Sequence, residues 1–503
     1  MIAKEIVAVY GRLGPFVQGL SRSLASLHFM LKVVNIDFST FFAWMHRMKT
    51  ESTFDRFCSQ SPFAVMTQIV LRACIHDCFS QSFEQARGRQ YQDVLTFENL
   101  AIAVADVALG ICKNPNQAYR AHKKDLNVAR SRFYDKINCT SPQLSQQIVA
   151  DTAIKVAEMQ DALGISLWEG IPGYRLLAID GNHLEKTDKR LEVLRGSRVA
   201  PLPGTGVCRF DLGRQIFDRV YLLEDAHQQE SATCDAIVDD LLETDVIIAD
   251  RHYCIVSFMN QIANKRSSFI IRQHGRLHGE LIGERKKLGT SSTGVVYEQQ
   301  MRLSSNEDAL VVRRITIELY EPTQEGETVI HVLTNLPSCV CGKLIAVQYH
   351  RRWEVETGYY YVRMCFNGEL ASLGHPRAAL FLFSLTVISY NILQVILNAL
   401  FVTHEEEEVN NVSGLYISKE IANVTPGMLI ALDDEYWEQI LPDGTRKAAS
   451  QLKQIAKQID LGLYVKSKRK PKEKRSGKQK VKKKRNARHS HASTAKLLGL
   501  TES

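Results

Sequence analysis

The segment from Tyr349 to Arg363 combines tyrosine, arginine and glutamate side chains at spacings that suit one face of an α-helix. With about 100° of rotation per residue, Tyr349, Arg352, Glu356 and Arg363 fall within a stripe about 60° wide. A carboxylate and two arginines on one stripe suit a metal ion that handles phosphates. We therefore predict a site for phosphate chemistry on this helix, which we call the signature segment.

The signature segment also carries apolar bulk. Charged side chains at helical spacing are most often the solvent face of a surface helix, and Glu354 points well away from the stripe. Trp353, Val355 and the run Tyr359–Val362 make a helix that is half buried. This composition favours a functional stripe over a plain surface.

The spacing resembles the Tyr-x2-Arg-x3-Glu-x6-Lys signature of bacterial insertion-sequence transposases of the DDE type, in insertion-sequence family four. Tyr349, Arg352 and Glu356 match its first three positions, and Arg363 stands where the family has Lys. Arginine keeps the charge but differs from lysine in shape and hydration. The resemblance implies a ribonuclease-H-like fold with two further carboxylates upstream.

Two aspartates in the right order supply these carboxylates. An Asp that follows a strand is usually a turn or cap residue, which is the ordinary interpretation of Asp180 and Asp250. However, Asp180-Gly181-Asn182 resembles the first-aspartate motif of the family, and Asp250-Arg251-x-Tyr253 resembles the second. Asp180, Asp250 and Glu356 are therefore the expected catalytic acids.

The resemblance also implies a mechanism and partners. Two Mg²⁺ (or Mn²⁺) ions are expected, with Asp180 bridging both, Asp250 on one and Glu356 on the other. Arg352 and Arg363 are expected to hold DNA phosphates, and Tyr349 to position the strand. The implied activity is cut-and-paste transposition on double-stranded DNA, both element ends and target, by a homodimer in the DNA complex.

Other functions have less support. A decayed transposase that only binds DNA is the main alternative, and Arg363 is the feature that favours it. Residues 378–402 carry no charge and are long enough to cross a bilayer, but Ser384, Asn391 and Asn398 form a polar stripe typical of a core helix. No Gly-rich phosphate loop of Walker spacing is present, so no nucleotide cofactor is expected. His252, and the cluster Glu224, Asp225, His227 and Glu230, are interpreted as turn and solvated-loop residues.

The elements that must position these side chains follow a β-β-β-α-β-α-β order. Expected strands are 175–179, 207–212, 216–223, 245–249 and 268–272, with helices at 234–242 and 253–265. Asp180 closes the first strand and Asp250 the fourth. Further strands at 295–302, 309–319 and 328–334 predict a β-rich insertion before the signature segment.

The predicted fold class is α/β: a ribonuclease-H-like core with a β-rich insertion, preceded by an all-helical domain. The predicted divisions are a helical, DNA-binding part (1–165), the first part of the core (174–274), the insertion (275–340), the signature and following core helix (341–403), a helical region (404–463) and a disordered basic tail (464–503).

Basic residues point to DNA at two places outside the core. Residues 117–123 and 128–137 resemble a helix-turn-helix joined at 125–127, whose second helix offers Arg130, Arg132 and Lys136. Residues 466–488 hold fourteen lysines and arginines against one glutamate. Such a run binds polyanions without sequence preference, or serves solubility alone.

The eleven cysteines are scattered without zinc spacing, and no secretory signal is visible at the N-terminus. We therefore expect reduced thiols in a cytoplasm, and the resemblance to insertion-sequence transposases implies a bacterial protein associated with the nucleoid.

Overall fold

The computed structural model describes residues 53–88, 90, 92–184, 191–194, 200–304, 309–323, 325–370, 372–467 and 491–500. The chain forms two compact units, one of residues 1–61 with 427–440 and one of residues 62–426 with 441–503. In the described part of the first unit, the Phe54 ring packs edge-on against Trp437 of α18 (Asp434–Ile440). The sheet and every predicted site residue within the described ranges belong to the second unit.

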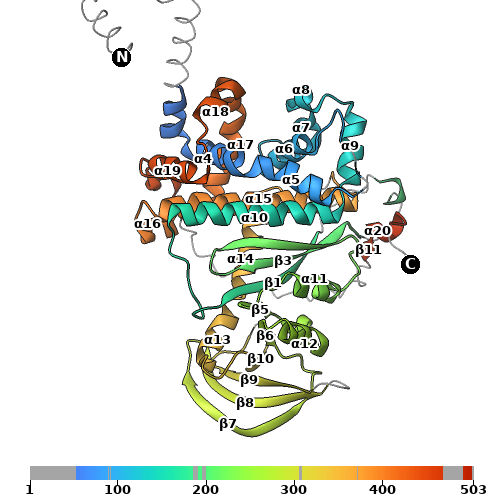
Figure 1. Ribbon diagram of the computed structural model, residues 1–503, viewed down its shortest axis with the longest axis vertical. Helices are drawn as coiled ribbons and strands as arrows, with labels where there is room; N and C mark the ends of the chain where they lie inside the picture. The colour runs from blue at the N-terminus through green and yellow to red at the C-terminus, as the bar shows by residue number, and fades with distance from the viewer. Residues whose placement is uncertain are drawn as a thin grey trace, which may run out of the picture. The chain divides into compact units, whose positions relative to one another are not determined.

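A nine-stranded mixed sheet is the centre of the second unit (Figure 1). Its strand order is β4-β3-β1-β5-β6-β10-β9-β8-β7, in which β1, β5 and β6 are parallel and all other neighbours antiparallel. The strands are β1 (Arg175–Leu184), β3 (Gly204–Asp211), β4 (Ile216–Leu223), β5 (Asp245–Ala249), β6 (Ser268–Arg272), β7 (Glu280–Thr290), β8 (Gly294–Ser304), β9 (Ala309–Leu319) and β10 (Val329–Thr334).

The predicted strands are all present, but the insertion is not a separate layer. β10 pairs with β6, so β7–β10 extend the core sheet without a break. β7 is absent from the predicted strands because Glu280, Arg285 and Lys286–Lys287 obscure any apolar alternation. β7 is an edge strand of the sheet, and most of its residues are exposed. Charged side chains on an edge strand discourage pairing with other chains.

The helices before the sheet belong to the same unit as the sheet. They are α4 (Pro62–Val70), α5 (His76–Ala86), α6 (Phe97–Ala108), α7 (Pro115–Ala121), α8 (Lys123–Leu126), α9 (Arg130–Cys139) and α10 (Pro142–Leu163). After the sheet come α13 (Gly342–His350), α14 (Trp353–Cys365), α15 (Pro376–Phe401), α16 (Glu406–Asn410), α17 (Gly414–Ala431) and α19 (Thr445–Ala456). Within the sheet's sequence lie α11 (Cys234–Asp239) and α12 (Val256–Asn264).

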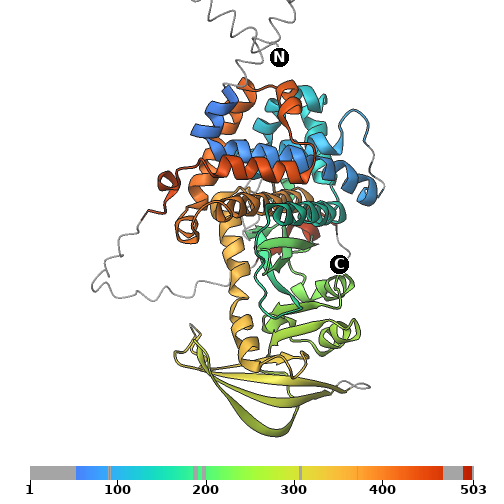
Figure 2. The same cartoon turned by 60° about the vertical axis from the view of Figure 1, so that its left-hand side comes forward.

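Helices α10 and α15 run side by side and cover β3 and β4 (Figures 1 and 2). α10 begins at a Ser141 cap, whose hydroxyl accepts a hydrogen bond from the Leu144 amide at 3.2 Å, with Pro142 in the first turn. It ends at Gly164 with φ of +69°, the left-handed conformation that glycine adopts without strain.

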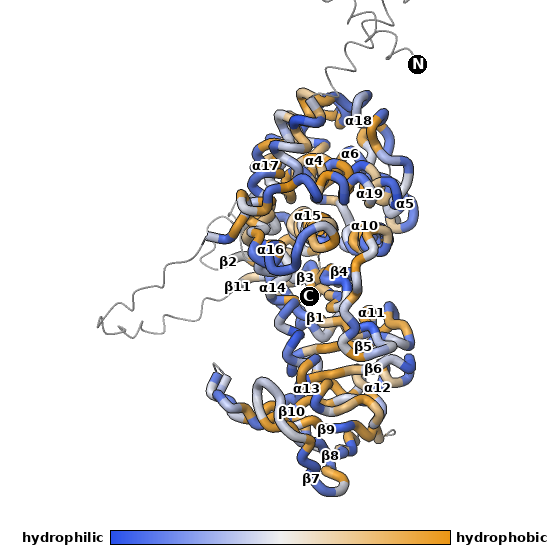
Figure 3. The backbone as a smooth tube through the Cα atoms, turned by 90° about the vertical axis from the view of Figure 1, so that its left-hand side faces the viewer, coloured by the Kyte–Doolittle hydropathy of each residue, from blue (hydrophilic) through white to orange (hydrophobic). Residues whose placement is uncertain are grey.

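The polar stripe of α15 meets other protein. Asn391 donates to the Phe217 carbonyl at 2.8 Å and accepts from the Phe217 amide at 2.9 Å, which satisfies an edge position of β4. Asn398 accepts from Gln160 of α10 at 2.9 Å. Among the described residues, α15 is the one helix long and apolar enough to cross a membrane, and 89% of its most apolar window is buried inside the protein. This burial agrees with the predicted core helix, and Figure 3 shows its hydrophobic colouring.

The opposite face of the sheet packs against α11 and α12. Leu177 and Ile179 of β1 and Ile247 of β5 form a buried cluster with Ile237 of α11 and Phe258 of α12. Successive side chains of a strand point to opposite faces. Asp180 therefore lies on the face opposite Ile179, which is the face that α14 approaches.

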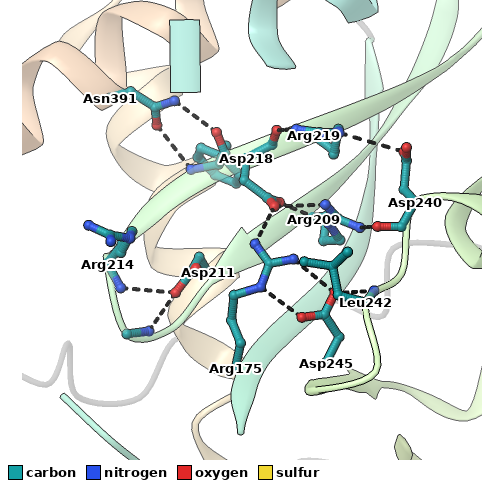
Figure 4. A network of polar contacts seen from close by, with 12 residues as sticks. Arg175, Arg209, Asp211, Arg214, Asp218, Arg219, Asp240, Leu242, Asp245 and Asn391 are labelled. Carbon is teal, nitrogen blue, oxygen red and sulfur yellow. Dashed lines mark hydrogen bonds and ion pairs between the residues drawn. The ribbon is translucent and has the colours of Figure 1, made fainter. Parts of the chain in front are cut away.

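An ion-pair network ties β1, β3, β4 and β5 together at the start of β1 (Figure 4). Arg175 forms two 2.8 Å hydrogen bonds with Asp245, which is fully buried, and lies 3.3 Å from Asp218. Arg209 binds Asp218 through two atoms at 2.9 and 2.7 Å. Arg175 and Asp245 are register partners in the parallel β1–β5 pair. Each lies five positions before a predicted acid, so the network fixes Asp180 and Asp250 at the same level of the sheet.

The end of the chain departs from the sequence prediction. Residues 491–500 fold as strand β11 (His491–Ser493) and helix α20 (Thr494–Leu497), in place of the disorder predicted from 464 to 503. β11 pairs in parallel with β2 (Ala200–Leu202), and Thr494 and Ala495 are fully buried. The physical reason is that the segment after the basic run carries side chains that can be buried, so it folds where the charged run before it would not. Glu406–Glu408 form the first turn of α16, where acids favour a helix start.

Candidate active site

Asp180 lies within β1, near the point where the pair with β5 ends. β5 pairs with residues 175–178 of β1, while the pair with β3 continues to Leu184. Beyond Ala178 one edge of β1 is therefore open, and Asp180 stands at this opening with about a quarter of its side chain (23%) exposed. The Tyr359 hydroxyl of α14 donates to the Asp180 backbone carbonyl at 2.6 Å, which holds the strand against the helix.

Asp250 directly follows β5 and caps a short turn. Its side chain accepts a hydrogen bond from the His252 amide at 2.8 Å and lies 2.9 Å from Nδ1 of the same histidine. The His252 ring is largely exposed. The turn Arg251–Tyr253 thus orients Asp250 at the same sheet end as Asp180. Asp250 is a cap residue, as the ordinary interpretation of the sequence holds, and it also faces the predicted site.

The signature segment is helical, as the sequence predicts, but it is not one unbroken helix. α13 ends at His350 and α14 begins at Trp353, because the amides of Arg351 and Arg352 bond three residues back, to Gln348 and Tyr349. Such a tightened turn keeps the chain nearly helical while changing the phase. Arg352 is the N-cap residue of α14, so Arg352 and Glu356 retain the predicted i,i+4 relation.

Arg352 joins two of the three predicted acids. Its guanidinium lies 3.1 Å from Glu356 and 3.8 Å from Asp180. Arg352 is buried, and its Nε has no hydrogen-bond partner among the described residues. The signature helix therefore brings Glu356 to the Asp180 end of β1 through a shared cation. Glu354 points elsewhere, to Arg351 and to Gln215, as the predicted helix phase requires.

The electrostatics of Asp180 reflect this crowding. Burial raises the pKa of Asp180 to about 7, with Arg352 opposing the rise and Glu230, Asp250 and Glu356 adding to it. Burial also raises the pKa of Tyr349, against the effect of Arg352. A second cation would therefore be favourable beside these acids.

The predicted DNA contacts differ in their exposure. Tyr349 and Arg352 are buried, whereas Arg363 is exposed on α14. Arg130 and Arg132 are exposed on α9, and Lys136 lies over the Phe83 ring, 5.6 Å from its centroid. Where two helices joined at 125–127 are predicted, the structure has three short ones, α7, α8 and α9, because α8 takes up Lys123–Leu126. Asn127, which has φ of +47°, ends α8.

Glu230 lies close to the predicted acids, although the sequence does not single it out. The sequence interpretation of the four residues at 224–230 is a solvated loop, but the structure divides them. Glu224 pairs with Arg377 at 2.8 Å, and Asp225 pairs with Lys496 at 3.1 Å. Glu230, at the start of a turn before α11, lies against β1 beside Asp180. Its position just before a helix, between the hairpin strands and the strand that precedes Asp250, is the signal that the sequence offers.

The donor set suits a hard cation. Asp180, Asp250, Glu230 and Glu356 offer carboxylate oxygens, the ligands that Mg²⁺ and Mn²⁺ prefer. Among the described residues, no three acidic, histidine or cysteine side chains are drawn together as a ready metal site. The arginine between Asp180 and Glu356 occupies part of that space. The carboxylate oxygens suit these ions, but the four acidic side chains would have to move closer together to bind one.

Residues 216–392 match the protein-family model described as "Transposase DDE domain". Over this stretch the chain is therefore similar to DDE transposase domains. The match runs from β4 into α15 and includes Asp250, Glu356 and Arg352, while Asp180 lies before it. It is the stretch that carries the signature segment.

Solved structures also give matches. A cryo-EM structure of the piggyBac transposase in a synaptic complex with hairpin DNA aligns with a TM-score of 0.38 and 11% identity, over 80% of this chain and 86% of that chain. No curated protein matches the chain.

Proposed function

We propose that this protein is a DNA transposase that cuts the ends of its own mobile element and joins the freed 3′-ends to target DNA. The observation that carries the proposal is the shared contact of Arg352 with Asp180 and Glu356, inside and beside a stretch that matches a DDE domain. The strand order β4-β3-β1-β5-β6, with Asp180 where the β1–β5 pairing ends and Asp250 directly after β5, supports a ribonuclease-H-like catalytic core.

In the proposed reaction, water attacks a phosphodiester and the 3′-oxygen leaves. The freed 3′-hydroxyl then attacks a target phosphodiester and the target strand's own 3′-oxygen leaves with the proton, without a covalent bond between protein and DNA. Two divalent ions would supply charge stabilisation and nucleophile activation, and Asp180, Asp250 and Glu356 would hold them. Arg363, exposed on the same helix, would contact DNA phosphate.

The signature spacing places the protein, in our proposal, near insertion-sequence family four, acting as a homodimer on DNA. A test incubates the protein with labelled DNA flanking its own gene and Mn²⁺ or Mg²⁺, and maps cuts at nucleotide resolution. Asp180→Asn, Asp250→Asn and Glu356→Gln should lose cleavage by at least about a hundredfold and still bind the ends, because each removes a charge that would hold an ion.

Glu354→Gln is the matched control, because Glu354 lies on the same helix but faces Arg351. It should cut at nearly the natural rate. An inactive Glu354→Gln together with an active Glu356→Gln would show that the wrong face of α14 was assigned. A natural protein that binds the ends without cutting would favour the binding-only alternative.

A further inference from the structure

The Glu230 side chain packs against the backbone of β1 at Gly181, where the strand has no side chain. A β-carbon added at Gly181 would lie 2.1 Å from Oε1 and 2.3 Å from the carboxyl carbon of Glu230, which is closer than atoms can approach. Gly181 has no positive φ, so its backbone does not require glycine. The absence of a side chain at position 181 is therefore needed for Glu230 to reach this strand.

The other carboxylate oxygen is held from the second aspartate's turn. The Tyr253 hydroxyl donates to Oε2 of Glu230 at 3.3 Å, and Tyr253 itself is buried. Tyr253 closes the turn Arg251–Tyr253 that Asp250 caps. Glu230 is thus fixed between the residue after Asp180 and the turn after Asp250. These contacts join both aspartates to an acid from a third part of the chain.

Glu230 has no basic partner among the ion pairs of the described residues, unlike its neighbours. Glu224 and Asp225 each pair with a base, Arg377 and Lys496. Placing a partly buried carboxylate beside two other acids is unfavourable unless a cation offsets it. Arg352 approaches Asp180 and Glu356 from the α14 side. Burial raises the pKa of Glu230, and the nearby rings of His183 and His252 oppose this rise without forming an ion pair with Glu230 among the described residues.

We infer that Glu230 is a fourth acid of the catalytic centre, which helps to hold a divalent cation beside Asp180 and Asp250. The inference rests on the proposed function, because it assigns a further ligand to the same centre. It also gives a role to two residues that the three-acid site leaves unexplained, Gly181 as the gap and Tyr253 as the clamp.

The test measures Mn²⁺ binding by calorimetry or electron paramagnetic resonance, without DNA, and cleavage separately. Glu230→Gln removes the charge but retains an oxygen that can accept from Tyr253, so folding should persist. We expect Mn²⁺ affinity to fall about 10- to 100-fold and cleavage to fall with it. Gly181→Ala, which displaces the carboxylate, should weaken Mn²⁺ binding in the same direction.

Two matched controls separate a metal role from a general loss. Glu224→Gln removes an acid six positions earlier that pairs with Arg377, and Gly275→Ala adds a β-carbon where no atom lies within 4 Å. Both should bind Mn²⁺ as the natural protein does. Natural Mn²⁺ affinity in Glu230→Gln, when Asp180→Asn has lost it, would overturn the inference and leave the proposed function standing. A natural protein that binds no Mn²⁺ would overturn both.

Discussion

At the scale of single residues, Arg352 supplies the positive charge that a metal ion would otherwise supply to Asp180 and Glu356. It lies between Asp180 and Glu356, whose charges would otherwise repel across a partly buried space. A buried guanidinium with an unpaired Nε is costly, so the contact is retained at some expense. We interpret Arg352 as the group that offsets the repulsion between Asp180 and Glu356 when neither metal nor DNA is bound.

Arg352→Gln tests this role without DNA. In EDTA the variant should lose about 1–3 kcal/mol of unfolding free energy, because two acids lose their shared partner. Added Mg²⁺ should stabilise the variant more than the natural protein, since the ion can replace the missing charge. Thermal melts with and without Mg²⁺ measure both effects.

Arg266→Gln is the control, because Arg266 forms an exposed pair with Glu243 and such pairs contribute little. It should melt almost as the natural protein does in both buffers. If Mg²⁺ stabilised Arg352→Gln no more than the natural protein, Arg352 would not be a stand-in for the ion.

The sequence predicts residues whose roles follow from spacing along one element. Glu356 and Glu354 can be separated because a helix has a fixed rotation per residue, and the structure turns them to different partners. Glu230 cannot be found in this way. Its role depends on its approach to Gly181 across the sheet, and no local pattern encodes which loop reaches which strand.

At the scale of elements, the pair Arg175–Asp245 aligns the two strands that carry the aspartates. Arg175→Gln should lower the unfolding free energy by about 2–4 kcal/mol, because Asp245 remains fully buried without its partner. The double variant Arg175→Leu with Asp245→Leu removes both charges and should be less destabilised than the single variant. Urea unfolding of the two proteins gives the comparison.

If the double variant lost more stability than Arg175→Gln, uncompensated charge would not be the cause. Cleavage adds a second measurement on the same pair. A variant that folds but lets β1 slip against β5 should cut poorly while its DNA binding stays unchanged.

The extended part of the sheet should respond to acid through His331. Burial lowers the pKa of His331 to about 4, and Arg314 and Arg285 add to this effect. The unfolded chain, with the ordinary pKa near 6.5, binds the proton first. Stability contributed by the neutral ring is therefore present above about pH 6.5 and is lost as the pH falls towards 4.

Hydrogen exchange of β9 and β10 at about pH 7 and about pH 5, on either side of the unfolded pKa, is the measurement. Protection, corrected for intrinsic exchange rates, should fall more in the natural protein than in His331→Gln, which retains a partner for Thr316 but does not titrate. Equal losses in both proteins would assign the acid response to another group.

The sequence predicts the strands that are buried inside the sheet, but it does not predict the exposed edge strand. β5, β6 and the first half of β1 are short apolar runs because they lie inside the sheet. β7 is exposed along most of its length and its charges hide it. The break between α13 and α14 likewise leaves no mark in the sequence, since no proline or glycine stands there.

At the scale of the whole molecule, the basic run is bounded by two anchored segments. Before it, Val465 bridges to Val412 and the Lys466 amide bonds to Asn411. After it, β11 pairs with β2. The run between them is therefore attached at both ends to the unit that carries the site.

Removing residues 468–490 should weaken binding to any DNA and flatten its salt dependence, by about 0.7–0.9 in log–log slope for each phosphate that the protein no longer neutralises. Preference for the element's ends should not change. Binding titrations at several salt concentrations, with end and random DNA, provide the test. Truncation after Tyr464 should show the same slope but a lower melting temperature, because it also removes β11 and α20. Loss of end preference alone would mean that the run reads sequence.

The pairing of β11 with β2 has a consequence for how the protein is made. The two strands lie almost 300 residues apart in the sequence, so at ribosomal speeds of about 5–20 residues per second β11 emerges roughly 15–60 s after β2. Until then the nascent chain carries β2 without its partner, beside strands that can already pair. Synthesis that ended inside the basic run would give a protein that has Asp180, Asp250 and Glu356 but lacks β11, so β2 would remain unpaired on that side. We expect cellular proteases to cleave such a protein first near the unpaired β2.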